Sequence, residues 1–259
     1  MKSNYRYIVK AFMAMAVIAG TTSCDDFLDR EPMSSISPET YYSTAAQLEA
    51  NLNDEYPNVL PSFGQWTYGI FGEDKGTDNQ IEVNANDRYT QDRWKVPHSE
   101  SDNWKFERIY RINFFLSEAL PKFGEDMIGS QNTISGSVAT IKHYIGEMYF
   151  LRAYEYFKKL QLFGDFPIIN QPLADEMEAL REASKRFPRN EVARFIISDL
   201  DKAYAYMSDV DMATTRINKD VAMLVKSRVA LFEATWLQNF KGTAFVPGGE
   251  GWPGASLHN

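Results

Sequence analysis

The chain of 259 residues is 44% hydrophobic and 14% aromatic, which is ample for a sizeable core in one large domain or two small ones. Its formal net charge of −8 excludes a protein that binds nucleic acid through bulk electrostatics. Three histidines and a single cysteine leave little for a zinc site, and we expect no metal and no cofactor.

The N-terminus has the pattern of a secretory signal peptide. The first ten residues carry three basic side chains and no acid, and residues 11–20 are all apolar or small. Small residues follow up to Ser23, where a cleavage site is expected. The apolar run is about half as long as a membrane-spanning helix requires. We therefore predict that residues 1–23 form an export leader rather than a membrane span.

Cys24, the only cysteine, comes directly after this leader. The arrangement resembles a bacterial lipoprotein leader, in which the cysteine is acylated and becomes the first residue of the mature chain. A lone cysteine in an exported protein has no partner for an intramolecular disulfide, which agrees with acylation. We predict a lipidated tether over residues 24–37 and a helical domain over residues 38–259.

The tether is acidic, with four carboxylates between Asp25 and Glu31. Such a stretch resembles the signal that sends some lipoproteins to the outer face of the outer membrane, and a solvated spacer is the alternative. Anionic lipid headgroups would repel a chain this acidic, so the lipid anchor must supply the membrane attachment.

The domain is predicted to begin with a helix. Thr44 and Gln47 have the spacing of a capping box, and Leu48 and Leu52 then lie on one helical face. The helix is expected to stop near one of two prolines, Pro57 and Pro61.

Residues 61–103 are rich in Gly, Asn and Asp and show no sustained period, which predicts a long irregular loop. A loop this long in a compact domain is usually functional or disordered, and its aromatic residues argue against disorder. Flat aromatic faces can stack on a ligand, and planar polar side chains can form hydrogen bonds with it. The candidates for ligand binding are Trp66, Tyr68 and Trp94 among the aromatics, and Asp78, Asn79 and Arg88 among the polar residues. Packing of these aromatics onto the scaffold is the alternative.

Helical stripes dominate the rest of the chain and predict a mostly α fold. The expected helices run from Phe106 to Pro121, from 138 to 163, from 192 to 207 and from 221 to 236, and an extended segment covers 166–169. Stacked antiparallel helices would bury the second of these, which is apolar on two faces. The expected apolar stripes include Tyr110 and Leu224, and Trp104 and Trp236 are expected in the core.

Residues 146–169, GEMYFLRAYEYFKKLQLFGDFPII, resemble a signature of the SusD/RagB family of surface glycan-binding lipoproteins. The CDDFLD start, the YRINFFL segment, FIISDLDKA at 195–203 and KDVAMLVKSRVALFEATW resemble further parts of the family in the same order. The resemblance implies a tetratricopeptide-like scaffold with long irregular loops, anchored in the outer membrane and facing the cell exterior. Members usually run to about twice this length, so we expect a chain truncated at its C-terminus.

The resemblance also implies a function without catalysis. Members capture oligosaccharides or polysaccharides, sometimes peptides, and deliver them to a TonB-dependent, SusC-like transporter. GTDNQ at 76–80 lies where members often place ligand-facing residues. The sequence contains no nucleophile-elbow motif, no HExxH motif and no phosphate-binding glycine loop. His143 has no nucleophile and no second metal ligand nearby in the sequence. A helical-repeat adaptor for proteins is the second hypothesis, and a surface hydrolase is the third.

Three polar residues in the helical part are expected to make internal contacts. Asn113 lies on an apolar stripe, where a buried amide would tie down a loop backbone. Arg152 and Asp165 are expected to form internal contacts, because arginine suits a structural pair with a carboxylate.

Overall fold

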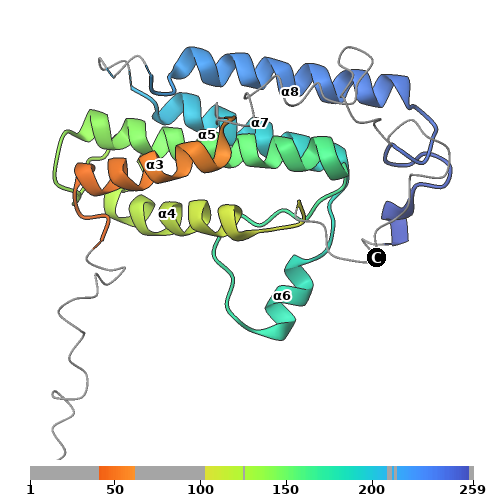
Figure 1. Cartoon of the computed structure of the whole chain (residues 1–259), viewed down its shortest axis with the longest axis horizontal. Helices are drawn as coiled ribbons and strands as arrows, with labels where there is room; N and C mark the ends of the chain where they lie inside the picture. Colours follow the sequence, from red (N-terminus) through yellow and green to blue (C-terminus); the bar gives the residue numbers. More distant parts are fainter. Residues whose placement is uncertain (1–40, 62–102, 125, 209–211, 213–214, 257–259) are drawn as a thin grey trace, which may run out of the picture. The chain divides into compact units, whose positions relative to one another are not determined.

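The computed structural model describes residues 41–61, 103–124, 126–208, 212 and 215–256. In these residues, which belong almost entirely to the compact unit Tyr42–Asn259, helices alternate with loops and β structure is confined to isolated bridges. The prediction of a mostly α fold is therefore confirmed (Figure 1). The elements are α3 (Ala45–Val59), α4 (Glu107–Phe123), α5 (Val138–Phe163), α6 (Met177–Ala183), α7 (Arg189–Tyr206), α8 (Lys219–Asn239) and the short 3-10 helix η3 (Pro253–Ser256).

Helix α5 is the centre of the unit. It packs against α3, α4 and α7, and α7 packs in turn against α8 (Figure 1). Apolar side chains are buried around the whole of α5, from Ile141 to Leu160, as a helix between several neighbours requires. This stacking of long helices agrees with the tetratricopeptide-like scaffold that the sequence predicts.

The capping box at the start of α3 is confirmed. The Thr44 hydroxyl accepts a hydrogen bond from the Gln47 backbone N–H at 3.3 Å, and the Gln47 side chain accepts one from the Thr44 N–H at 3.1 Å. These bonds satisfy two of the amide groups that a helix start leaves without partners. Leu48 and Leu52 are fully buried on the face that the sequence indicates.

The expected end of α3 near Pro57 or Pro61 is confirmed, whereas α4 continues past its expected end at Pro121. Helix α3 continues through Pro57 to Val59, and α4 continues through Pro121 to Phe123. Proline removes one hydrogen bond from a helix, but it does not prevent the next residues from packing. Val59 and Phe123 are both fully buried, so tertiary contacts hold the last residues in helical conformation.

Parts of the predicted apolar stripes were also wrong. Tyr110 on α4 is 51% exposed and Leu224 on α8 is 71% exposed. Helix α8 packs mainly on α7, so its opposite face has no neighbour among the described helices. Trp104 precedes α4 and is half-buried against the rings of Phe163 and Phe166, with centroids at 4.9 Å in both cases.

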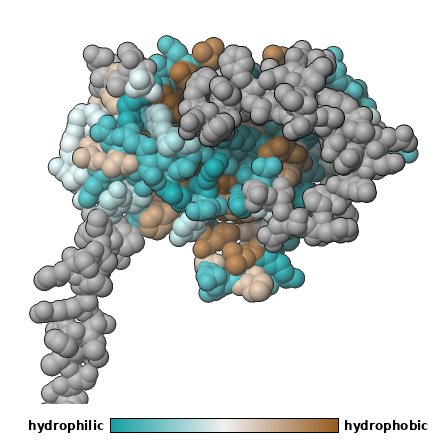
Figure 2. All heavy atoms as spheres, in the orientation of Figure 1, coloured by the Kyte–Doolittle hydropathy of each residue, from teal (hydrophilic) through white to brown (hydrophobic). Residues whose placement is uncertain are grey.

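Helix α6 was not predicted. It has no buried residues and projects from the other helices (Figures 1 and 2). Met177 at its start is 81% exposed. Its sequence, MEALREA, consists mostly of good helix formers, and ion pairs at i, i+3 such as Glu178–Arg181 support it. None of the helices in the described ranges is both long and apolar enough to cross a membrane.

Candidate functional site

The candidate site forms where the chain leaves α5. Gly164, with a φ of 68°, ends the helix, and its N–H donates to the carbonyl of Leu160 at 3.0 Å. The extended segment expected here follows, and Phe166 pairs with Phe187 through two backbone hydrogen bonds of 3.0 and 3.1 Å. This pairing brings the end of α5 next to the start of α7.

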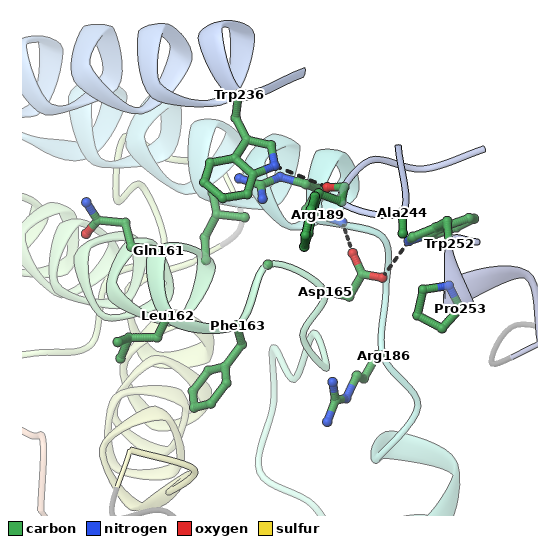
Figure 3. Close-up of a pocket in the computed structure, with 13 residues that line it drawn as sticks. Gln161, Leu162, Phe163, Asp165, Arg186, Arg189, Trp236, Ala244, Trp252 and Pro253 are labelled. Carbon is green, nitrogen blue, oxygen red and sulfur yellow. Dashed lines mark hydrogen bonds between the residues drawn. The ribbon is translucent and has the colours of Figure 1, made fainter. Parts of the chain in front are cut away.

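Asp165 joins three segments at this point. Its Oδ1 accepts a hydrogen bond from the backbone N–H of Arg189 at 2.8 Å, and its Oδ2 accepts one from the indole Nε1 of Trp252 at 3.0 Å (Figure 3). A carboxylate at the first residue of α7 is favoured by the unpaired amides and the dipole of the helix. The expected internal role of Asp165 is confirmed, although its partners are backbone and indole donors.

Arg189 and Glu233 form a buried ion pair between α7 and α8. The Arg189 Nη2 lies 2.9 Å from the Glu233 Oε2, and both side chains are nearly inaccessible to solvent. The guanidinium carbon also lies 4.1 Å from the centroid of the Trp236 ring. The ion pair and this stacked contact together fix the Trp236 ring at the edge of the site.

A cavity of about 300 Å³ opens between these segments (Figure 3). Trp236 comes from α8, while Phe245 and Trp252 come from the segment that follows it, and Phe245 is 62% exposed. The indole Nε1 of Trp236 donates to the Phe245 carbonyl at 3.1 Å. Trp236 was expected in the core, but it is half-buried and lines this cavity because only one side of α8 is covered.

The lining of the cavity is both aromatic and polar. Its walls combine indole and phenyl groups with polar side chains, among them Asp165, Arg186 and Gln161. Its volume lies at the lower end of the range for small-molecule pockets, which is about 300–1,000 Å³. Aromatic rings can cover the apolar face of a sugar while the polar groups bind its hydroxyls.

Arg152 is part of the scaffold rather than of this cavity. Its Nε and Nη2 donate to the two oxygens of Asp199 at 2.6 and 2.8 Å, and its Nη1 donates to the side chain of Asn113 and the carbonyl of Asn170. Burial alone would lower the pKa of Arg152, but its hydrogen bonds to Asp199 and the charge of that carboxylate raise it. Asn113 also donates to the backbone carbonyl of Ile169, so both expected internal roles are confirmed.

His143 also serves the scaffold. Its Nε2 lies 3.0 Å from the carbonyl oxygen of Ile217 and 3.1 Å from a carboxylate oxygen of Glu147, and the ring is buried. Glu147 in turn accepts hydrogen bonds from Arg216 and Tyr56. Within the described residues, no three His, Cys, Asp or Glu side chains lie in an arrangement that could hold a metal.

The lipidation site and the ligand-binding residues expected from the sequence lie outside the described ranges. This applies to Cys24 and to the loop candidates Trp66, Tyr68, Asp78, Asn79, Arg88 and Trp94. The roles assigned to these residues therefore remain predictions.

Sequence reasoning missed the cavity near Asp165. The FGDFP motif marks the end of α5, but it does not indicate that Trp252, 87 residues away, will bond to its aspartate. One signal was available: Trp236, Phe240, Phe245 and Trp252 recur at the end of the chain, and the last two lie in a glycine-rich loop. Aromatic residues in a loop require a reason to face water, and the cavity supplies one.

A family model of the SusD-like kind, described as "Starch-binding associating with outer membrane", matches residues 26–231. Among curated proteins, the SusD-like proteins P25 and P2 of Formosa agariphila are each 25% identical to this chain. Their alignments cover 83% and 93% of this chain but only 41% and 46% of the relatives. The chain therefore spans less than half the length of these relatives.

Two solved structures share the fold. A SusD-like carbohydrate binding protein from Bacteroides fragilis aligns over 78% of this chain and 40% of its own, with a TM-score of 0.53 and 18% identity. A SusD-like carbohydrate binding protein from Bacteroides vulgatus aligns over 75% of this chain and 43% of its own, with a TM-score of 0.50 and 16% identity. The family resemblance and the helical scaffold that the sequence predicts are thus confirmed.

Proposed function

Because the chain belongs to the SusD-like family, whose model is described as starch-binding and associating with the outer membrane, we propose that it is a non-catalytic surface protein that captures glycans. The match over residues 26–231 is the observation that carries this proposal. The captured oligosaccharide would pass to a TonB-dependent, SusC-like transporter in the outer membrane, which is the partner that the family resemblance implies.

The cavity near Asp165 is one place where the glycan would bind. It offers Trp252 and Phe245 as flat faces beside polar side chains, which is the combination that a sugar ring requires. The loop candidates, led by Trp66 and Trp94, are the second place, and the two sites would hold different parts of one oligosaccharide or act separately.

The anchoring of the protein is part of the same proposal. Acylation of Cys24 would hold the chain in the outer membrane, and the acidic tether behind it would direct the protein to the cell exterior. Two or three acyl chains give stable attachment, whereas a single chain gives only marginal binding.

A protein adaptor is the alternative, and one observation favours it. Leu224 and Leu231 on the outer face of α8 are 71% and 66% exposed, and such a face can contact another protein. A hydrolase has less support. Burial raises the pKa of Glu55, but this carboxylate lies on α3 and pairs with Arg111 rather than lining the cavity near Asp165.

Affinity electrophoresis of the full chain in detergent, against a panel of plant, host and microbial polysaccharides, tests the proposal. We expect at least one glycan to retard the protein, and Trp252→Ala to reduce that retardation if the cavity holds the ligand. Trp66→Ala and Trp94→Ala test the loop in the same gels. Tyr110→Ala, which removes an exposed aromatic outside the cavity, is the matched control.

The outcomes separate the hypotheses. Retardation that is lost in Trp94→Ala or Trp66→Ala but kept in Trp252→Ala would place the ligand in the 61–103 loop. No retardation of the folded wild-type chain by any glycan would contradict glycan capture by this chain and favour the adaptor.

A further inference from the structure

Arg186 differs from the other arginine that lines the cavity. Arg189 is neutralised by its ion pair with Glu233, whereas the contact of the Arg186 guanidinium is with an aromatic ring. No carboxylate among the residues that the structure describes lies within ion-pairing distance of Arg186. The cavity therefore contains a cation that has hydrogen-bond donors to offer.

The position of Arg186 is set by the aromatic cluster beneath it. Its guanidinium carbon lies 4.7 Å from the centroid of the Trp104 ring, and Trp104 is held edge-on against Phe163 and Phe166. Stacking on a ring occupies the flat face of a guanidinium and leaves the N–H groups at its edge accessible. Arg186 itself is exposed, so a ligand can reach these groups from solvent.

Asp165, the carboxylate that lines the cavity, already accepts hydrogen bonds at both oxygens. One oxygen of Asp165 accepts from the Arg189 amide and the other accepts from the Trp252 indole (Figure 3). The carboxylate therefore positions Trp252, and it is not an open acceptor that would select a cationic ligand. The fork of Arg186 therefore remains available to a ligand, and its side chain is directed away from Asp165 and Trp252 (Figure 3).

We propose that the cavity selects acidic sugars, with Arg186 binding the anionic group. This inference rests on the proposed glycan-binding function and specifies its substrate class. A planar guanidinium can donate two parallel hydrogen bonds to a carboxylate or to a sulfate ester, so uronic acids and sulfated sugars share the required chemistry. The net charge of −8 opposes anionic ligands in general, and a local cation would be needed to overcome it.

Isothermal titration calorimetry of the full chain in detergent tests this inference with three probes. They are digalacturonic acid, a sulfated galactose disaccharide and neutral galactobiose. We expect one of the acidic disaccharides to bind about tenfold more tightly than the neutral one, as hydrogen bonds to a charged group allow. Arg186→Gln is expected to remove this preference, and Arg186→Lys to restore only part of it. The preference should also weaken as salt is raised.

Arg181→Gln is the matched control, because it removes the same charge from exposed α6, where Arg181 pairs with Glu178. It should leave the preference unchanged. If the neutral disaccharide binds the wild type as tightly as both acidic ones, or if Arg186→Gln keeps the preference, selection of acidic sugars by Arg186 is wrong while glycan capture stands. Absence of binding by all three probes and by the wider polysaccharide panel would overturn both proposals.

Discussion

Arg152, Arg186 and Arg189 show how position decides the role of one residue type. Arg152 lies in the middle of α5, and Asp199 and Asn113 take up its donors. Arg189 is buried with Glu233, and its charge is compensated there. Arg186 lies exposed on the surface with its guanidinium over the Trp104 ring, so we assign it, of the three, to the ligand.

The Arg152–Asp199 pair yields a prediction at this scale. Asp199→Ala would leave the guanidinium of Arg152 buried without its carboxylate, and breaking a buried pair in this way costs about 3–5 kcal/mol. We expect the free energy of unfolding, measured by urea denaturation, to fall by this amount. Asp201→Ala on the same helix is the control, because Asp201 is half exposed and its pair with Lys226 contributes about 1 kcal/mol or less. Equal losses in both variants would show that burial of the first pair is unimportant.

At the scale of elements, the contact between α5 and α7 depends on a glycine. A Cβ atom on Gly146 would lie 2.8 Å from the backbone nitrogen of Met207 and 2.9 Å from the carbonyl oxygen of Ala203. Backbone atoms cannot move aside as a flexible side chain can. Gly146 therefore allows the end of α7 to approach the central helix closely.

We predict that Gly146→Ala destabilises the protein, although alanine is the better helix former by about 1 kcal/mol. Forced overpacking typically costs about 1–3 kcal/mol, and a backbone neighbour places this case at the upper end. Thermal unfolding followed by circular dichroism would measure the loss. Ser227→Ala on the exposed side of α8 serves as the control and should stay within about 0.5 kcal/mol of the wild type. A Gly146→Ala variant as stable as the wild type would mean that α7 can shift without cost.

At the scale of the whole molecule, the proposed function depends on attachment to the outer membrane. The leader and the lone Cys24 predict a lipid anchor, and the acidic residues behind it predict exposure on the cell surface. These features act on the location of the protein and require nothing from the helical scaffold, so they can be tested separately from glycan binding.

We predict that Cys24→Ser abolishes labelling with radioactive palmitate in a Gram-negative host and releases the protein from the membrane fraction, because acylation requires the thiol. Asp25→Asn combined with Asp26→Asn should keep the label but reduce cleavage by protease added to intact cells. Labelling that persists in Cys24→Ser would contradict lipid attachment at Cys24. Unchanged cleavage of the double variant would indicate that the acidic stretch is only a spacer.

The sequence by itself determined the helical fold class, the capping box of Thr44 and Gln47, the extent of α5 and the family. These features depend on local chemistry and on the spacing of apolar residues, and both can be recognised in the sequence. It also indicated that Asn113 and Arg152 bind internally, since polar groups on apolar stripes must find partners.

Only the tertiary structure decided the rest. Helix α3 runs past Pro57 and ends before Pro61, and α4 runs past Pro121, because Val59 and Phe123 are buried in the core. Tyr110 and Leu224 are exposed because a stripe does not reveal how many neighbours a helix will have. The cavity forms because Asp165 contacts both Arg189 and Trp252, and the second of these lies 87 residues away in sequence. Packing brings such distant residues together, and no local sequence pattern encodes it.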